Sequence, residues 1–286
     1  MKQIETGIYI EKNYLGVTLG AIALRGGTLL IDAPLHPDDG RIWLSSVRGL
    51  GGGASRMVVC LDSHPDRTIG LRALDTSVLS HIVTAVLLEE LPAIFKGQNL
   101  KSGAEWELSD GLNGIRWARP SLTFSEQLLV EWGEEQVIVE YHPGPAPGAS
   151  WVVIPEANVV FIGDAVVRNQ PPFLAEAELP AWIEALDLLI SSDYRNYLFV
   201  SGRGGLVDKT EIREQRRFLK DVHARLENLA ERESEPRQTE KMVKNLLSKF
   251  DFKRDMQSLY TNRLTYGLHH YYARHYYPHV ENEESN

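Results

Sequence analysis

The 286-residue chain contains a single cysteine, Cys60, and little that would direct it to a membrane. One cysteine excludes an internal disulfide framework and is typical of proteins kept in a reducing compartment. The sequence has no apolar run of about eighteen residues, the length that a transmembrane helix needs. Its first residues, MKQIET, carry charge but lack the apolar core of a signal peptide. We therefore expect a cytoplasmic protein without membrane contact.

A surplus of basic residues is also absent. Lysine and arginine number 30 against 39 aspartates and glutamates, which gives a formal net charge of -9 at pH 7. Nucleic-acid backbones bind basic surfaces, so no nucleic-acid partner is expected. The hydrophobic content of 43% and charged content of 24% are ordinary for a globular protein. The length allows one large core or two modest ones.

What the sequence does contain is a strand pattern that ends in ionisable side chains. The segment 58–70 reads VVCLDSHPDRTIG. Its apolar, β-branched start predicts a buried strand that ends near Leu61, and Pro65 is typical of a first helical turn. Proteins that alternate strands and helices usually place their chemistry at the carboxyl ends of strands. The polar residues Asp62, His64 and Asp66 are therefore candidates for a functional site.

Hydrophobic periodicity predicts a mixed α and β chain built as one large domain. Strands are expected over residues 7–11, 17–24, 28–31, 57–61, 82–86, 114–118, 127–132, 136–141, 151–154, 159–162 and 197–200. Helices are expected over residues 37–50, 69–74, 87–95 and 179–190, and over most of the chain from Thr210. The rest of region 98–125 is expected to be loop, because it is rich in glycine, serine and asparagine.

Four segments, taken in order within about residues 4–232, resemble motifs of the metallo-β-lactamase superfamily. They read TLLIDA (28–33), DSHPDR (62–67), PGPAPGA (143–149, with VFIGD at 160–164 after it) and VSGRG (200–204). The first resembles the family's strand ending in Asp-Thr or Asp-Ala, and the second its His-x-His-x-Asp-His signature. The third and fourth resemble Pro-Gly-His-Thr-Pro-Gly-Ser and Pro-Gly-His-Gly. Because all four lie in register with the intervening strands, the resemblance implies the family's fold.

That fold is α/β (α+β): a four-layer αββα sandwich of two sheets with helices outside. The resemblance implies a metallo-β-lactamase-like domain over residues 1–232. We expect residues 233–286 to be a C-terminal helical extension that packs on it. Within the extension, an apolar stripe at helical spacing needs a surface to cover, either on the same chain or in a homodimer. The stripe comprises Tyr260, Leu264, Leu268, Tyr271 and Tyr272.

The resemblance also implies a metal site, which this sequence retains only in part. Members of the superfamily usually hold two metals, often zinc, through five histidines and two aspartates, and the bound hydroxide attacks an ester, amide, thioester or phosphodiester. Carried over by position, His64, Asp66 and Asp164 are retained. Four of the seven expected ligand positions hold other residues: Asp62, Arg67, Pro145 and Arg203. Proline has no side-chain ligand atom, and arginine stays cationic and repels a metal.

Charge counting suggests what replaces the metals. Asp62, Asp66 and Asp164 would be costly to bury together without compensation. Arg67 and Arg203 supply two positive charges, and guanidinium groups form strong, geometrically specific pairs with carboxylates. A protonated His64, one monovalent cation or one aspartate with a raised pKa would complete the balance. We therefore expect the two arginines to pair with the aspartates in the place of the metals.

Two functions remain open on the sequence. The first is a non-catalytic homologue of a hydrolase, a pseudoenzyme without a cofactor that binds a small anionic or polar ligand or serves as a partner protein. The alternative is a hydrolase of an ester, thioester, lactone or phosphodiester that uses one divalent metal, such as zinc, manganese or iron. His64, Asp66 and Asp164 would hold that metal, with Asp62 as a fourth ligand, and His64 and Asp66 would be catalytic. His142 is a further candidate for a substitute ligand.

Overall fold

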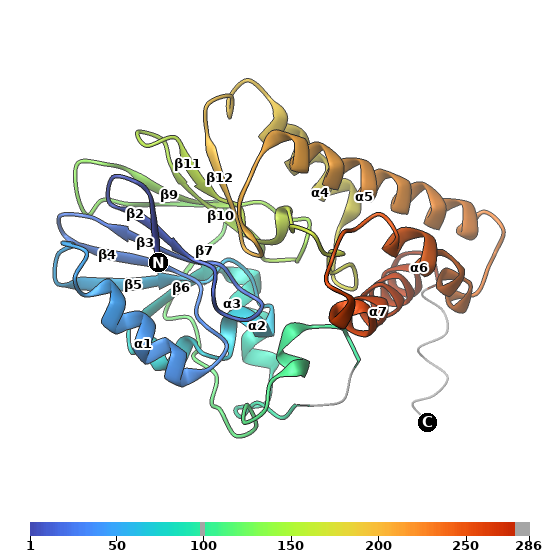
Figure 1. Cartoon of the computed structure of the whole chain (residues 1–286), viewed down its shortest axis with the longest axis horizontal. Helices are drawn as coiled ribbons and strands as arrows, with labels where there is room; N and C mark the ends of the chain where they lie inside the picture. Colours follow the sequence, from blue (N-terminus) through green and yellow to red (C-terminus); the bar gives the residue numbers. More distant parts are fainter. Residues whose placement is uncertain (98–100, 278–286) are drawn as a thin grey trace.

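Two β-sheets lie face to face at the centre of the molecule, and helices cover the outer face of each (Figure 1). The computed structural model describes residues 1–97 and 101–277. The apolar side chains between the sheets come from both of them, including Ile31 and Val59 of the first and Val152 and Phe161 of the second. The four layers confirm the αββα sandwich that the sequence predicts.

The first sheet has seven strands in the described chain, arranged in sequence order. They are β1 (Lys2–Glu5), β2 (Ile8–Glu11), β3 (Leu19–Ala23), β4 (Gly27–Ile31), β5 (Ser55–Val59), β6 (Ser77–His81) and β7 (Leu122–Phe124). Strands β1 to β4 pair antiparallel, whereas β4 to β7 pair in parallel. The helices that connect the parallel strands are α1 (Pro37–Val47), α2 (Pro65–Thr68) and α3 (Ile82–Glu90).

The second sheet has six strands in the described chain, in the order β13-β12-β11-β10-β9-β8. They are β8 (Gln127–Val130), β9 (Val137–Tyr141), β10 (Ser150–Ile154), β11 (Val159–Phe161), β12 (Leu198–Ser201) and β13 (Gly205–Val207). All neighbours are antiparallel except β11 and β12. Short 3-10 helices are η1 (Leu71–Leu74), η2 (Glu105–Leu108), η3 (Gly163–Ala165), η4 (Pro236–Thr239) and η5 (Arg254–Met256).

Alternation of side chains along β4 explains how the layers separate. Leu29 and Ile31 face the second sheet, whereas Leu30 packs with Trp43 of α1 on the outer face. Successive side chains of a strand point to opposite faces, so an all-apolar strand is buried on both. Because β4 and β5 are parallel, with Ile31 opposite Val59, their carboxyl ends reach the same edge of the sandwich. That edge carries the polar residues described below.

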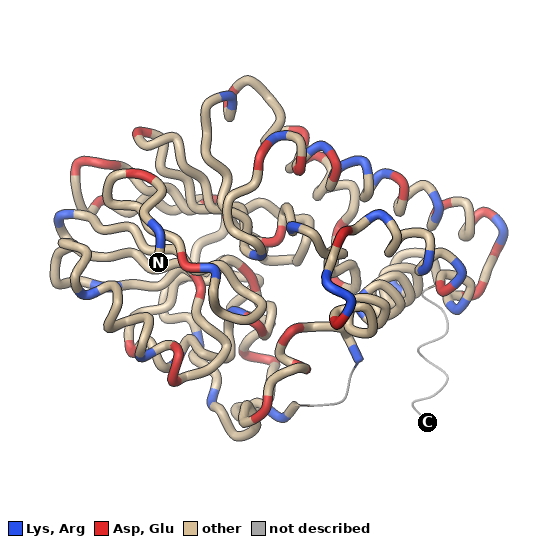
Figure 2. Tube along the Cα trace, viewed as in Figure 1, with Lys and Arg blue, Asp and Glu red and all other residues tan. Residues whose placement is uncertain are grey.

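Helices α4 (Leu179–Ile190), α5 (Lys209–Ala230), α6 (Glu240–Leu247) and α7 (Gln257–Tyr276) share one apolar cluster with the second sheet. The predicted stripe on α7 lies inside it, with Leu264 and Leu268 fully buried. Lysines, arginines and acidic residues follow one another along α5 (Figure 2). Helices of the described chain are too short or too polar to cross a bilayer. Residues 278–286 of the predicted extension lie outside the described residues. The domain boundary at 232 and a homodimer through these helices stay predictions.

Two predicted strands are wrong. Residues 82–86 begin helix α3, and the strand precedes them as β6. The β-branched residues Ile82 and Val83 suggested a strand, but Nδ1 of His81 accepts a hydrogen bond from the Val83 amide at 3.2 Å and starts a helix there. At residues 114–118 only Arg116 forms a bridge, with Ile94, and the strand of this region is β7. The sequence analysis also missed β1 and β13.

We expect Leu268→Ala to lower the free energy of unfolding by roughly 2–5 kcal/mol, because it empties a fully buried position between α7 and the rest of the cluster. Ile42→Ala, at a helical position that is 58% exposed, is the control and should change stability by no more than about 0.5 kcal/mol. Urea unfolding followed by circular dichroism measures both. A loss of stability in Leu268→Ala as small as that in Ile42→Ala would contradict the packing of α7 on the rest of the protein.

Candidate functional site

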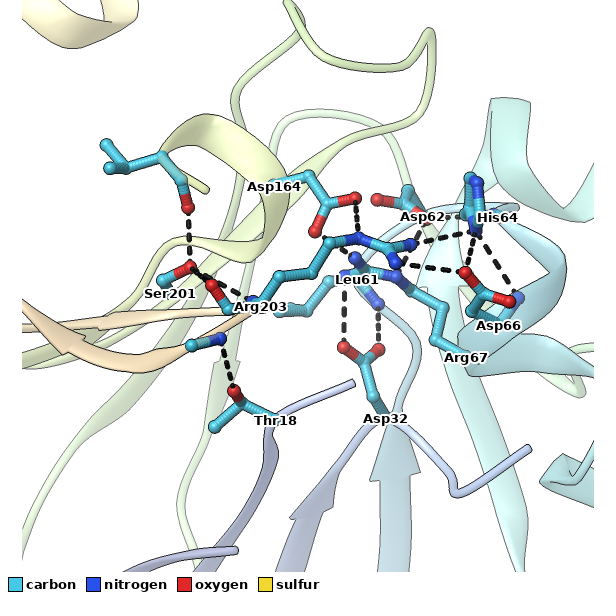
Figure 3. A network of polar contacts seen from close by, with 12 residues as sticks. Thr18, Asp32, Leu61, Asp62, His64, Asp66, Arg67, Asp164, Ser201 and Arg203 are labelled. Carbon is cyan, nitrogen blue, oxygen red and sulfur yellow. Dashed lines mark hydrogen bonds and ion pairs between the residues drawn. The ribbon is translucent and has the colours of Figure 1, made fainter. Parts of the chain in front are cut away.

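Charged side chains from both sheets meet where four strands end (Figure 3). Asp32 follows β4 and Asp62 comes soon after β5 in the first sheet. In the second sheet, η3 after β11 carries Asp164, and the turn after β12 carries Arg203. The structure therefore brings the predicted residues Asp62, Asp164 and Arg203 together, although they lie up to about 140 positions apart in the sequence.

The turn from β5 into α2 directs Arg67 into the space between the sheets. Oδ1 of Asp62 accepts a hydrogen bond from the His64 amide at 2.8 Å, and His64 caps α2 by accepting from the Asp66 amide at 3.3 Å. Both contacts satisfy amides that a helix start leaves without partners. Arg67 follows Asp66 in this helix, and its side chain is fully buried.

Arg67 contacts an aspartate with each of its three nitrogens. Nη1 donates to Oδ2 of Asp32 at 3.1 Å, and Nη2 pairs with Oδ1 of Asp164. Nε lies 3.1 Å from Oδ1 of Asp62. Asp32 also accepts from the Leu61 amide at 2.9 Å. One guanidinium on α2 thus joins the segments that follow β4, β5 and β11.

Arg203 forms a second centre beside the first. Its Nε donates to Oδ2 of Asp164 at 2.8 Å, so Asp164 bridges the two arginines. Its Nη1 donates to Oδ2 of Asp66 at 2.9 Å and to Oε2 of Glu105 at 2.6 Å. Its Nη2 lies 2.9 Å from Nδ1 of His64. The ion pairs that the sequence predicts between these arginines and the aspartates are present.

The backbone before Arg203 approaches the cluster closely. A Cβ at Gly202 would lie 2.9 Å from Oδ1 of Asp164 and 3.1 Å from Nη1 of Arg67. Oγ of Ser201 accepts from the Arg203 amide at 3.0 Å and donates to the Val166 carbonyl at 2.5 Å. These contacts fix the turn that presents Arg203, and they leave room only for glycine at position 202.

Sequence analysis missed three members of the cluster: Asp32, Glu105 and Arg263. Asp32 was quoted as part of a motif, but its pairing with Arg67 depends on a contact between distant segments. Glu105 lies on η2, in a region without periodicity. Arg263 of α7 donates from Nη2 to Oε1 of Glu105 and from Nε to the Gly103 carbonyl, at 2.6 and 2.8 Å. Arg263 could have been identified from the sequence, because it is a charged residue within a stripe of apolar positions on a predicted helix.

Charges in the cluster do not balance when every group is ionised. Three guanidinium groups (Arg67, Arg203, Arg263) face five carboxylates (Asp32, Asp62, Asp66, Glu105, Asp164), which leaves a charge of -2. Burial outweighs the neighbouring arginines at Asp32 and Asp66 and raises the pKa of each carboxyl to about 7. At Asp164 and Glu105 burial acts in the same direction, but the arginines prevail and lower the pKa. Protonation of Asp32 and of Asp66 therefore brings the net charge of the cluster toward zero.

His64 does not supply the missing positive charge. Burial lowers its pKa, and the adjacent guanidinium of Arg203 lowers it further. A guanidinium can only donate hydrogen bonds, so Nδ1 of His64 must accept from Arg203. Burial of Asp32 and Asp66 supports a raised aspartate pKa, whereas the hydrogen bond from Arg203 to His64 speaks against a protonated His64.

The donor set does not fit a metal ion. Each retained ligand candidate, His64, Asp66 and Asp164, already accepts from a guanidinium nitrogen. Asp62, the candidate fourth ligand, faces Arg67. Across the described residues, no three His, Cys, Asp or Glu side chains are arranged to hold a metal. A cation among these atoms would have to displace two buried guanidinium groups that carry the same sign of charge.

His142, the candidate substitute ligand, has other contacts. Its Nε2 lies 3.1 Å from Oε2 of Glu140, and its ring stacks on Trp151 with centroids 3.6 Å apart. These contacts hold the imidazole on the outer side of the second sheet, where Trp151 belongs to the cluster beneath α4. The expectation that His142 could replace a ligand finds no support in this geometry.

An apolar cavity of about 210 Å³ lies beside His64. Its lining includes Trp106, Pro145, Phe173 and, from α7, Tyr266. Phe173 packs on the His64 ring at a centroid distance of 4.3 Å. The same ring lies 4.7 Å from Cζ of Arg203 and 4.0 Å from Cζ of Arg263. The cavity therefore borders the charged cluster at His64, and the Phe173 ring lies over Arg203 and Arg263.

Comparison with known proteins gives a family and a fold. The family model described as the metallo-beta-lactamase superfamily matches residues 16–201. No curated protein matches the chain.

Solved structures with the same fold share little sequence. A metallo-beta-lactamase from Pontibacter korlensis is 18% identical, with a TM-score of 0.61 over 77% of this chain and 97% of that one. The DIM-1 metallo-beta-lactamase is 16% identical, with a TM-score of 0.60 over 77% and 96%. A double mutant of the sec-alkyl sulfatase PisA1 is 15% identical, with a TM-score of 0.68 over 99% of this chain and 51% of that one. The likeness to the sulfatase thus includes the C-terminal helices.

We expect Arg203→Ala to destabilise the fold by roughly 3–5 kcal/mol, because it leaves Asp66, Glu105 and Asp164 buried without their shared cation. Arg25→Ala is the matched control. Its pair with Glu134 is largely exposed, and its loss should cost no more than about 1 kcal/mol. Chemical unfolding at neutral pH gives both values, and equal values for the two variants would contradict a buried cluster.

A second prediction concerns pH. The folded pKa of about 7 at Asp32 exceeds the unfolded value of 3.8, so the folded state binds the extra proton between them. The stability contributed by this proton is complete below about pH 4 and is lost as the pH rises through about 7. In Asp32→Asn the decline of stability over this window should be shallower than in the wild type, by up to about 1.4 kcal/mol per pH unit.

Urea midpoints measured across this pH window test the difference. His64 has a lowered pKa and acts in the opposite direction, but it is common to both proteins. Asp110→Asn alters an exposed aspartate and should keep the wild-type profile. An Asp32→Asn profile parallel to that of the wild type would show that Asp32 does not hold the proton.

Proposed function

This chain belongs to the metallo-β-lactamase superfamily, and we propose that it is a non-hydrolytic member that works by binding a small ligand. One observation carries the proposal: guanidinium nitrogens of Arg67 and Arg203 contact every residue retained from the family's metal-binding pattern. The arginines stand where histidine ligands are expected, and they provide from within the chain the positive charge that metals would bring.

The chemistry left to these residues also supports the proposal. Hydrolysis in this fold needs a water made nucleophilic and a positive charge to stabilise the developing oxyanion. His64 is a weak base here, because its Nδ1 is engaged by Arg203 and burial lowers its pKa. Arg67 and Arg203 are at most 2% exposed and are neutralised by carboxylates, so they are poorly placed to meet an oxyanion.

Metal content and turnover test the proposal directly. We expect protein purified without chelator to carry less than one equivalent of zinc, because displacing a buried arginine from its carboxylates is costly. We also expect no metal-dependent turnover of a lactone, a thioester, a phosphodiester or a β-lactam with added Zn²⁺, Mn²⁺ or Fe²⁺. Elemental analysis and the substrate panel give these results, and an active metallo-β-lactamase assayed in parallel serves as the positive control.

Two histidine variants separate the proposal from the single-metal alternative. Zn²⁺ titration calorimetry should give the same result for the wild type, His64→Ala and His142→Ala. Zinc binding or metal-dependent turnover that is lost in His64→Ala but kept in His142→Ala would overturn the proposal. It would favour a hydrolase with one metal at His64, Asp66 and Asp164.

A further inference from the structure

We propose that the cavity walled by α7 and the His64 ring binds an uncharged, largely apolar small molecule that carries one hydrogen-bond acceptor. This inference rests on the proposed function and adds the chemical class of the ligand. The sequence predicted a small anionic or polar ligand, and this inference departs from the anionic alternative. Three features support it: the position of the cavity, the hydrogen bonding of His64, and the lack of an unpaired cation among the described residues that line the cavity.

The cavity depends on a part of the chain beyond the family match. Arg263, Tyr266 and Gly267 of α7 form one side of it, and the opposite side comes from loops of the sandwich, including Pro65 and Pro145. The family model ends at residue 201. The pocket is therefore a product of α7 packed against the site, and Pro145, which replaces an expected histidine, contributes an apolar surface instead of a ligand atom.

His64 provides a hydrogen-bond donor to this cavity. Its Nδ1 accepts from Nη2 of Arg203 at 2.9 Å and from the Asp66 amide at 3.3 Å, and both partners are obligate donors here. The ring proton must then sit on Nε2. Figure 3 shows the contacts of His64 with Arg203 and Asp66, and because His64 also lines the cavity we place Nε2, the other ring nitrogen, on the cavity side. An Nε2–H group selects an acceptor such as a carbonyl or ether oxygen.

The charges around the cavity disfavour an anion. Arg263 is the one cation among the described residues that line it, and its side chain is fully buried. Its nitrogens donate to the Gly103 carbonyl, to Gln170 and the Pro171 carbonyl, and to Glu105. At the rim, Glu176 is 71% exposed, and its cationic neighbour Arg274 is 4.0 Å away. An anion would lose its hydration and gain no cation in exchange.

The size and surface of the cavity complete the ligand class. Its volume of about 210 Å³ exceeds the roughly 150 Å³ of an apolar protein cavity that binds benzene, so it suits a small molecule. Trp106, Phe173 and Leu174 supply apolar contact area, so burial of an apolar body would provide most of the binding free energy. The Nε2–H group of His64 would then orient the ligand, with the hydroxyl groups of Ser63 and Tyr266 also in the lining.

Three probes with one apolar body test the class: acetophenone, ethylbenzene and benzoate. We expect acetophenone to bind the full-length protein about fivefold more tightly than ethylbenzene, because only acetophenone offers an acceptor to Nε2–H. Benzoate should bind more weakly than acetophenone. Titrations followed by protein-observed NMR give the dissociation constants and show which residues respond.

A pair of alanine variants tests the location. Ala146→Phe adds a ring to a residue that lines the cavity and should abolish acetophenone binding. Ala224→Phe, the same substitution at an exposed position of α5, should leave binding unchanged. Circular dichroism verifies that both variants are folded.

Each contrary result has a distinct meaning. Tighter binding of benzoate would overturn the uncharged class and favour an anionic ligand. Acetophenone binding that survives Ala146→Phe would place the site elsewhere, and no binding of acetophenone to the wild type would overturn the inference. None of these results bears on the proposed lack of hydrolysis, which is decided by the zinc titration and turnover measurements.

Discussion

The pairing of two buried guanidinium groups with carboxylates from both sheets is the interaction on which this site depends. Arg67 joins the ends of β4 and β11, and Arg203 joins the end of β12 to α2 and η2. Asp164 contacts both arginines, so the two centres form one network. Buried charges are stable only when each is paired. Removal of one partner leaves the others buried without compensation, which strongly destabilises the fold. The network therefore holds three of the segments that line the cavity: the start of α2, η2 and, through Arg263, α7.

The same network determines what the neighbouring cavity can recognise. Because Arg203 occupies Nδ1 of His64, the imidazole turns its remaining N–H toward the apolar space. Because Glu105 occupies Arg263, the guanidinium nearest the cavity has no free charge to offer. Both effects change a position associated with charged chemistry into one that suits an uncharged molecule. A pocket that consists mostly of apolar surface with a few fixed polar groups is the usual form of a small-molecule site.

The sequence predicted the sandwich well because alternating apolar strands and four motifs in register reflect the fold directly. It also predicted that Arg67 and Arg203 would face the aspartates, since the motifs placed them at neighbouring strand ends. It did not predict Glu105 or Arg263, because their contact joins an irregular loop to a helix 158 positions away. Local pattern was misleading at Ile82, where β-branched residues start a helix that His81 caps. Contacts between distant, aperiodic segments leave no trace in periodicity.

The hydrogen bond between Glu105 and Arg263 has a consequence for how this site is completed during synthesis. Arg263 leaves the ribosome long after Glu105, so this carboxylate lacks one of its two arginine partners until α7 has docked. Part of the counter-charge of this cluster thus lies on α7, far along the chain from the carboxylate that it pairs with. Docking of α7 would therefore complete the cavity wall and pair Glu105 with its second arginine in a single event.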